Sequence, residues 1–301
     1  MYRELDVLVQ GFHYDDMQSE SLYDATRKWC FLIPPIFGPF QFFIDAPFGR
    51  FAPSNDSIFV VDGIKSWIIM ELVSPISFIA ALYRGPWAAS SSAIFTPQVI
   101  LTSLFIVHYL NRAIISPLRT PSRSKSHIAV ALFAVVFNLV NGTLMGIYLS
   151  SPTASAFLAG AFSRPSFWAG IILWACGFAG NILHDEVLLD IRRKSKAKGK
   201  RNENKLGKEH YAIPHGYLYR YISYPNYFCE WSEWFGYALA AAPLPALMPL
   251  TETMRTVQPP WLFLWAEVLF MISRAYRGHQ WYHKNFPEYP KERKAVVPFI
   301  F

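Results

Sequence analysis

The chain has 301 residues, of which 52% are hydrophobic and only 16% are charged. Soluble domains usually carry about 25% charged residues. Apolar runs recur along nearly the whole chain, so the composition excludes a pair of soluble domains and favours one multi-span membrane bundle. The formal charge of +7 lies in one segment, residues 191–210, which holds nine Lys or Arg and two Glu. Because this segment connects two apolar runs, it indicates a cytosolic loop and not a nucleic-acid surface.

Seven apolar segments are candidates for membrane-spanning helices. In chain order we expect them at residues 29–44, 66–83, 97–116, 127–150, 154–183, 232–250 and 257–273. The predicted fold is an all-α integral membrane protein, a seven-transmembrane-helix bundle over residues 29–283. A segment 1–28 precedes the bundle, and a tail 284–301 follows it. Cys30, Cys176 and Cys229 are widely spaced in or beside apolar stretches, which predicts neither a disulfide framework nor a metal site.

Basic residues indicate how the bundle is oriented, because cytosolic loops are enriched in Lys and Arg. Such residues gather after the third span, after the fifth span and in the tail. An even number of spans separates these three segments, so all three are expected on the same side. We therefore predict a lumenal N-terminus and a cytosolic C-terminus, with segment 1–28 in the lumen and both the basic loop 191–210 and the tail 284–301 in the cytosol.

Glu71 and Tyr109 are conspicuous within two of the expected spans. Glu71 lies near the middle of the second span, where a carboxylate costs several kcal/mol unless it is neutral or paired. Tyr109 lies near the cytosolic end of the third span, from which it could reach Glu71 across the bundle. Taken alone, a tyrosine at this depth is also typical of an interfacial anchor, and the glutamate could serve only to hold helices together.

Further polar residues gather at the expected cytosolic ends of the last three spans. They are Asn181, Asp185, Arg192, Tyr211, Asn226, Glu230, Arg274, His279 and Tyr282. Cations and amide donors of this kind suit a dinucleotide with its pyrophosphate. No Gly-x-Gly-x-x-Gly occurs in the chain, so such a ligand would be held by the bundle and not by a Rossmann site. The charged residues after Asp185 are equally typical of a solvated helix end.

Several motifs are similar to those of one enzyme family. Trp67 is followed four residues later by Glu71, and the third span contains His108-Tyr109-x-x-Arg112. Further matches are Phe48-Gly-Arg-Phe-Ala52, Asn138 with Asn141-Gly142, Tyr289-Pro-Lys-Glu-Arg-Lys294 and Pro298-Phe-Ile-Phe301. From about residue 45 to its end, the chain resembles the steroid 5α-reductases. These are integral-membrane enzymes that reduce the C4–C5 double bond of 3-keto-4-ene steroids with NADPH.

The resemblance implies roles for particular residues. Glu71 and Tyr109 are expected to hold the 3-keto oxygen of the substrate, and Trp67, Met70 and Phe105 are expected to contact the steroid. The nine polar residues at the cytosolic ends of the spans occupy positions that resemble the NADPH-contacting set. The resemblance also implies a multi-pass protein of the endoplasmic reticulum membrane, with a lipophilic steroid or sterol reaching it from the bilayer. Membrane lipid is the expected surrounding partner, with no nucleic acid and no metal.

Other functions compete with this interpretation. The closest is a sister reductase, acting on very-long-chain trans-2-enoyl-CoA or on polyprenol, since the tail motif is shared among these enzymes. The Trp67/Glu71 element favours the steroid branch. His279-x-x-x-His283 has the spacing of a membrane di-iron hydroxylase, but the chain has only eight histidines and no His-x-x-His-His. A transporter would also explain buried polar residues, but no inverted repeat is visible.

Overall fold

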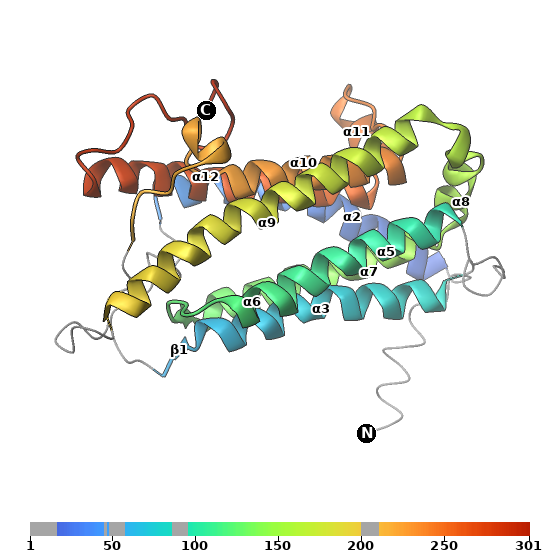
Figure 1. The fold of residues 1–301 in the computed structure, drawn as a ribbon. Helices are drawn as coiled ribbons and strands as arrows, with labels where there is room; N and C mark the ends of the chain where they lie inside the picture. The colour runs from blue at the N-terminus through green and yellow to red at the C-terminus, as the bar shows by residue number, and fades with distance from the viewer. Residues whose placement is uncertain (1–16, 45–46, 48–57, 86–95, 200–210) are drawn as a thin grey trace.

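The computed structural model describes residues 17–44, 47, 58–85, 96–199 and 211–301. Within this part of the chain, seven helices of at least 13 residues form a bundle (Figure 1). They are α2 (Met17–Phe37), α3 (Gly63–Arg84), α5 (Pro97–Tyr109), α7 (Ile128–Leu149), α9 (Pro165–Gly199), α10 (Pro225–Ala241) and α12 (Pro259–Asn285). Helix α3 packs against α7, α9 packs against α10, and α12 contacts α2 and α10.

Short elements connect the long helices. They are α6 (Ser116–Arg119), α8 (Pro152–Leu158), α11 (Leu250–Thr256) and 3-10 turns at Gly38–Phe42, Ala161–Ser163 and Tyr217–Arg220. Strand β1 (Val60–Val61) pairs antiparallel with β2 (Ser126–His127). This small ribbon joins the chain before α3 to the chain before α7, so it ties the N-terminal ends of these two neighbouring helices together.

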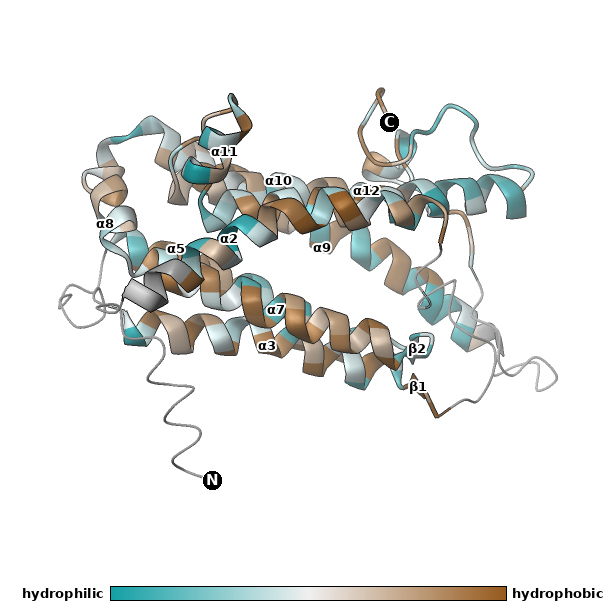
Figure 2. Cartoon of the chain, turned by 180° about the vertical axis from the view of Figure 1, so that it is seen from behind, coloured by the Kyte–Doolittle hydropathy of each residue, from teal (hydrophilic) through white to brown (hydrophobic). Residues whose placement is uncertain are grey.

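Four of the helices in the described residues are long and apolar enough to cross a membrane. These candidate spans are Gly63–Arg84, Pro97–Arg119, Ile128–Leu149 and Pro165–Ala197. Figure 2 shows apolar residues along α3 and α7, whereas the C-terminal ends of α9 and α12 are polar and lie at the same end of the bundle. The structure therefore has the mostly helical, membrane-suited character that the composition predicts.

Several helices begin or end at other residues than the predicted spans. The first helix, α2, begins at Met17 and not at residue 29, because Arg27 and Lys28 both pair with Asp24 and Arg27 donates to the carbonyl of Val257. Asp24, Arg27 and Lys28, which were predicted to belong to a polar segment 1–28, are thus part of a helix. Residues 1–16, the motif at 48–52 and residues 200–210 of the basic loop lie outside the described residues.

The fifth and sixth spans also differ from the prediction. The segment 154–183 is not one helix: α8 ends at Leu158, Gly160 adopts a left-handed conformation (φ 67°), and α9 starts at Pro165. Helix α9 then continues to Gly199, through the first part of the predicted basic loop. The sixth helix, α10, begins at Pro225 and ends at Ala241, earlier than 232–250, because Pro243 and Pro245 follow. The last, α12, extends to Asn285, beyond both the predicted end of the seventh span at 273 and that of the bundle at 283.

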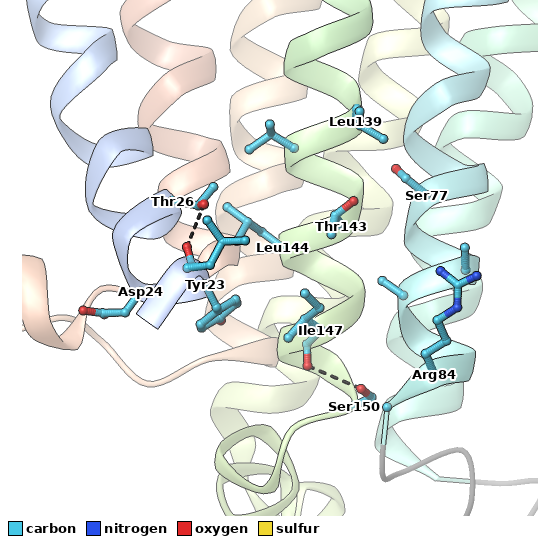
Figure 3. A pocket seen from close by; sticks show the side chains of 15 residues that line it. Tyr23, Asp24, Thr26, Ser77, Arg84, Leu139, Thr143, Leu144, Ile147 and Ser150 are labelled. Atoms are coloured by element: carbon cyan, nitrogen blue, oxygen red, sulfur yellow. Dashed lines mark hydrogen bonds between the residues drawn. The ribbon is translucent and has the colours of Figure 1, made fainter. Parts of the chain in front are cut away.

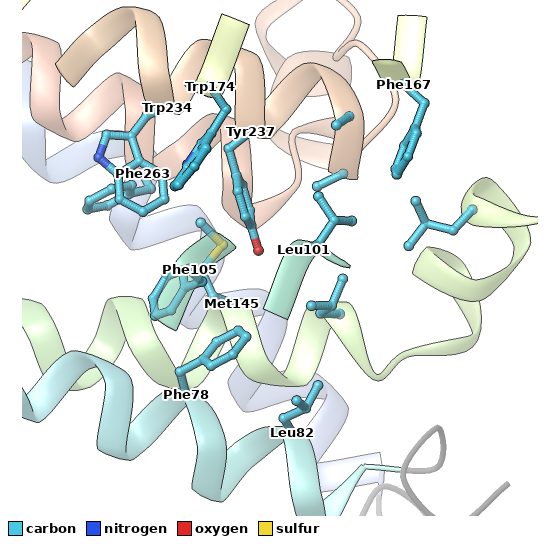
Figure 4. Packing of buried hydrophobic residues seen from close by; sticks show 14 of the residues in the cluster. Phe78, Leu82, Leu101, Phe105, Met145, Phe167, Trp174, Trp234, Tyr237 and Phe263 are labelled. Carbon is cyan, nitrogen blue, oxygen red and sulfur yellow. The ribbon is translucent and has the colours of Figure 1, made fainter. Parts of the chain in front are cut away.

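The core of the bundle is aromatic. The rings of Phe78 and Phe105 stack at a centroid distance of 4.2 Å, and Trp234 packs edge-on against Phe263 at 4.5 Å (Figure 4). Phe105 also contacts the ring of Trp234 at 5.9 Å. These contacts join α3, α5, α10 and α12 immediately beside the residues considered next, so the cluster is a rigid base for them.

Candidate active site

A cavity of about 440 Å³ lies between α3, α5, α7, α10 and α12. This volume falls in the range of small-molecule sites. Its lining is mainly apolar, with Phe133, Phe137 and Phe263 among the contributing side chains. The ionisable and polar members come from all sides. They include Glu71, His108, Tyr109, Arg112, Arg123, Asn138, Tyr227, Glu230, Glu267 and Arg274.

Glu71 and Tyr109 both line this cavity and both are buried, with exposed fractions of 9% and 3%. Tyr109 is the last residue of α5, and its ring packs against Phe105 at 4.8 Å. The chain then forms a π-helical turn at Leu110–Ile115. Such turns are rare and occur frequently at functional sites. Here the turn carries Arg112, whose Nε lies 3.7 Å from Oε1 of Glu71, so it places a cation beside the acid.

Trp67 lies one turn before Glu71 on α3 and is held by two arginines. The guanidinium of Arg123 lies 3.6 Å from the centre of the indole ring, and that of Arg112 lies 4.8 Å from it. The indole Nε1 also donates to the backbone carbonyl of Arg112 at 3.2 Å. Trp67 and Met70 line the cavity, so two of the three residues expected to contact the steroid share a cavity with Glu71. Phe105 is not among the lining residues; it is fully buried in the aromatic core behind Tyr109.

A hydrogen-bonded network links α9 to α10 beside the cavity. Asn181 donates to the carbonyl of Asn226 and to Oε2 of Glu230, both at 3.1 Å. Asn226 in turn donates to Oδ1 of Asp185 at 3.0 Å. Glu230 is 2% exposed and reaches Nη2 of Arg112 at 3.5 Å. Four of the nine residues predicted to contact a cofactor therefore form one connected group, which meets the Glu71 side of the cavity through Arg112.

Arginines converge at the same end of the cavity. Burial first, and then the guanidinium groups of three neighbouring arginines, lower the pKa of Arg123 to about 9. The neighbours are Arg112, Arg192 and Arg274. A guanidinium keeps its charge in proteins. The neighbouring arginines therefore create a positive potential, and a bound anion would reduce their mutual repulsion. The residues present therefore fit a ligand that carries several phosphate groups.

Two buried groups and one half-buried acid were not predicted as site residues. His108 Nδ1 lies 2.7 Å from Oε1 of Glu233, and this pair connects α5 to α10 beneath the cavity. Glu267 lines the cavity from α12. A signal for Glu267 exists in the sequence, because it is an acid inside the expected span 257–273 and meets the same criterion as Glu71. Glu233 meets it too, because it lies inside the expected span 232–250. Its pairing with His108, across 125 residues, has no signal in the sequence.

The remaining predicted cofactor residues take different positions. Arg274 lines the cavity, and its Nε donates to the hydroxyl of Tyr227 at 3.1 Å. Tyr211 packs against Trp281, and Tyr282 stacks on Tyr289 with ring centres 5.0 Å apart. His279 Nδ1 lies 2.6 Å from Ser223 Oγ. Tyr211, His279 and Tyr282 therefore contact the C-terminal part of the molecule and are not among the residues that line the cavity.

A larger cavity, of about 680 Å³, lies at the opposite ends of α3 and α7, against α2 (Figure 3). Its charged lining residues are Asp24 and Arg84, and the rest is mostly apolar. It does not gather the buried acids, tyrosine and arginines of the smaller cavity, which is therefore the better candidate for chemistry. In the described residues, no group of three or more His, Cys, Asp or Glu side chains is placed to hold a metal ion.

Comparisons with known proteins agree with these features. The family model described as 3-oxo-5-alpha-steroid 4-dehydrogenase matches residues 124–301. An uncharacterized protein of Schizosaccharomyces pombe is 37% identical over 87% of this chain and 93% of its own length. The 3-oxo-5-alpha-steroid 4-dehydrogenase 1 of Bos taurus is 32% identical over 85% of this chain and 88% of its own. The corresponding enzyme 2 of Macaca fascicularis is 33% identical over 78% of this chain and 80% of its own.

These matches confirm the resemblance inferred from the motifs. The chain belongs to the 3-oxo-5-alpha-steroid 4-dehydrogenase family and is an oxidoreductase that acts on CH–CH groups.

Proposed function

We propose that this protein reduces the C4–C5 double bond of a 3-keto-4-ene steroid or sterol with NADPH, and that Tyr109 and Glu71 hold the keto oxygen. The observation that carries the proposal is the shared cavity: Glu71 and Tyr109 line it, and Arg123 and Arg274 line it too. An apolar chamber with an acid and a phenol at one place and cations at another suits an apolar enone beside a polyanionic cofactor.

The reaction requires specific help from the protein. NADPH, when bound, would supply the hydride for C5 of the enone and leave as NADP⁺, and negative charge would develop on the 3-keto oxygen. Tyr109 would donate a hydrogen bond to that oxygen, and Glu71, on α3, would help to hold the same oxygen. Stabilising developing charge with fixed donors in a dry cavity is commonly the largest contribution to such catalysis. Phe133, Phe137 and Phe263 would exclude water during hydride transfer. The resulting enolate would then take up at C4 a proton that comes from solvent, so that the hydride and this proton together saturate the C4–C5 bond.

The cofactor would be held by residues at the polar end of the cavity. Arg112, Arg123 and Arg274 would bind its phosphate groups. The network of Asn181, Asp185, Asn226 and Glu230 would present amide and carboxylate groups to its sugars and its nicotinamide. Arg192 adds positive charge from α9. We assign Tyr211, His279 and Tyr282 a supporting role, because they hold the tail against the segment that leads into α10.

The setting proposed for this reaction is the endoplasmic reticulum membrane. Four apolar candidate spans support a multi-pass protein, and α2, α10 and α12 would complete seven crossings. The steroid would reach the cavity from the bilayer, and the cofactor would reach it from the cytosol. The N-terminus would lie in the lumen and the C-terminus in the cytosol.

The proposal is tested by following NADPH oxidation by the purified protein in detergent. A 3-keto-4-ene steroid such as testosterone or progesterone should be reduced at C4–C5, and NADH should serve less well than NADPH. A very-long-chain trans-2-enoyl-CoA and a polyprenol serve as the competing substrates. Turnover of either competitor, with none of the steroids, would replace the proposal by the sister-reductase function.

A further inference from the structure

Glu267 is a third acid that lines the cavity, on a different helix from Glu71 and Glu230. Residues Phe263, Glu267, Phe270 and Arg274 are spaced by three or four positions along α12, so they share one face of that helix, and all four line the cavity. Along this face the carboxyl group stands between Phe263 and Phe270, about two turns before the arginine at the polar end. Among the lining residues that α12 contributes, Glu267 is the one carboxylic acid.

The other acids of this region have protein partners. Glu71 faces Arg112, Glu230 faces Arg112 and accepts from Asn181, and Glu233 faces His108. Oε2 of Glu267 is buried, yet it receives no hydrogen bond from the described residues. No Lys, Arg or His of the described part of the chain lies within ion-pair distance of this carboxyl group. Burying an unpartnered polar oxygen is unfavourable, which indicates that a ligand in the cavity supplies the missing donor.

We propose that Glu267 binds a hydroxyl group of the substrate, so that this enzyme prefers a 3-keto-4-ene steroid bearing a hydroxyl outside its enone. This inference rests on the proposed function. Glu71 and Tyr109 hold the keto oxygen, so the hydroxyl that reaches α12 belongs to another part of the same molecule. A site built to bond a hydroxyl discriminates strongly against the analogue that lacks it, because the analogue leaves the buried oxygen unpaired.

Matched steroids test this specificity by binding, independently of turnover. Progesterone, deoxycorticosterone and corticosterone gain one hydroxyl at each step, and testosterone carries a hydroxyl where androstenedione carries a ketone. Their dissociation constants are measured by quenching of tryptophan fluorescence in the presence of NADP⁺, which cannot deliver hydride. We expect at least one hydroxylated steroid to bind about 10-fold or more tightly than its partner.

Variants then identify the responsible side chain. Glu267→Leu should abolish the preference by weakening only the hydroxylated steroid, while Glu267→Gln, which keeps an accepting oxygen, should retain part of it. Phe270→Leu, one turn away on the same face, is the matched control and should weaken both members of a pair alike. Melting temperatures of the variants show whether each is folded. If Glu267→Leu does not fold, the comparison of wild type with Glu267→Gln still tests the role of this side chain.

The remaining outcomes are decisive in different ways. A preference that survives in Glu267→Leu overturns this assignment, and so does a wild-type protein that binds the members of every pair equally. If Glu267→Leu lost NADPH affinity but kept its discrimination between steroids, the carboxyl oxygen of Glu267 would bind the carboxamide of the cofactor and not a steroid hydroxyl. If wild-type protein binds hydroxylated steroids through Glu267 but does not reduce them, the inference about Glu267 holds and the proposed reaction fails.

Discussion

At the scale of single residues, the carbonyl-binding pair makes the strongest prediction. Tyr109→Phe removes one hydroxyl from a buried, well-packed ring, so folding and NADPH binding should persist while kcat falls. Losing one donor to a developing oxyanion typically costs about 100- to 1,000-fold in rate. Glu71→Gln should be milder than Glu71→Ala, because it keeps a hydrogen-bonding group beside Arg112.

Since both side chains would act on one oxygen, their effects should not add. The double variant, Tyr109→Phe with Glu71→Gln, should be little slower than the poorer single variant, as measured by steady-state reduction of a 3-keto-4-ene steroid. Wild-type turnover by Tyr109→Phe, or complete additivity, would return the tyrosine to a packing role.

The arginines predict how the cofactor is held. Arg274→Ala should weaken NADPH binding about 10- to 100-fold, because a hydrogen bond to a charged group contributes about 1.5–3 kcal/mol. Isothermal titration of the detergent-solubilised protein measures this directly. Arg255→Ala is the control: this arginine is exposed on α11 and pairs with Glu252. Equal affinity in both variants would place the cofactor away from the converging arginines.

At the scale of helices, the α9–α10 contact sets the position of the polar network. A Cβ added at Gly177 would meet the backbone of Cys229 and Glu233, and one added at Gly236 would meet the backbone of Gly170 and Trp174. The two helices therefore approach as closely as small residues allow, as is common between membrane helices. This approach brings Asn181 within hydrogen-bond distance of Glu230.

Gly177→Ala should force α9 and α10 apart. Overpacking of this kind costs about 1–3 kcal/mol, so we expect a lower melting temperature together with weaker NADPH binding, since Asn181 loses its partner. Ala175→Leu adds more volume on the exposed side of the same helix and should leave both properties close to wild type. Unchanged melting of Gly177→Ala would show that the helices can separate without consequence.

The tail of the molecule predicts a pH dependence. His279 Nδ1 and Tyr289 Oη both lie within 2.7 Å of Ser223 Oγ, and the backbone of Ser223 and Tyr224 donates to Lys294 and Ala295. Burial first, and then His283 and Lys294, lower the pKa of His279 from 6.5 to about 4. The folded state therefore favours the neutral imidazole. Its contribution to stability is complete above pH 6.5 and is lost as the pH falls through 4.

Thermal unfolding between pH 7 and pH 4 tests this interpretation. The wild-type melting temperature should decrease over this window, and His279→Asn, which keeps a short polar group but cannot take up a proton, should show a shallower decrease. Gln280→Asn, at the exposed position next to His279, is the control; it removes no ionisable group and should retain the wild-type slope. Parallel curves for wild type and His279→Asn would remove His279 as the source of the pH dependence.

At the scale of the whole molecule, the sequence predicts where helices lie better than where they begin and end. It also predicts which acidic residues are buried better than which residues they contact. Apolar runs in the sequence coincide with the four helices of the described residues that are long and apolar enough to cross a membrane, since a span needs about 20 mostly apolar residues. The ends of helices depend on proline positions and on local pairs such as Asp24 with Arg27, which hydropathy does not capture. Glu71 is evident because an acid in an apolar run is costly. The stacking of Arg123 on Trp67 is not evident from the sequence, because this contact depends on how the chain folds around α3.

The orientation of the bundle is the last prediction. The structure brings the basic segments to one end: Lys196 on α9 donates to the carbonyl of Pro121, and Arg119 pairs with Glu186. The polar end of the cavity, with Arg123 and Arg274, lies at this same end. Positive segments remain cytosolic during insertion, so this end should face the cytosol and receive the cofactor there.

Glycosylation acceptor sites inserted singly into the full-length protein test the orientation. An acceptor within residues 194–209 should stay unmodified in microsomes, whereas one at the N-terminus and one in the turn 159–164, at the opposite end of α9, should be glycosylated. A protease added to sealed microsomes should cleave at 194–209 and spare the other two positions. Glycosylation at 194–209 would show that the bundle has the opposite orientation and that the cofactor enters from the lumen. This conclusion would apply to a seven-span bundle as well.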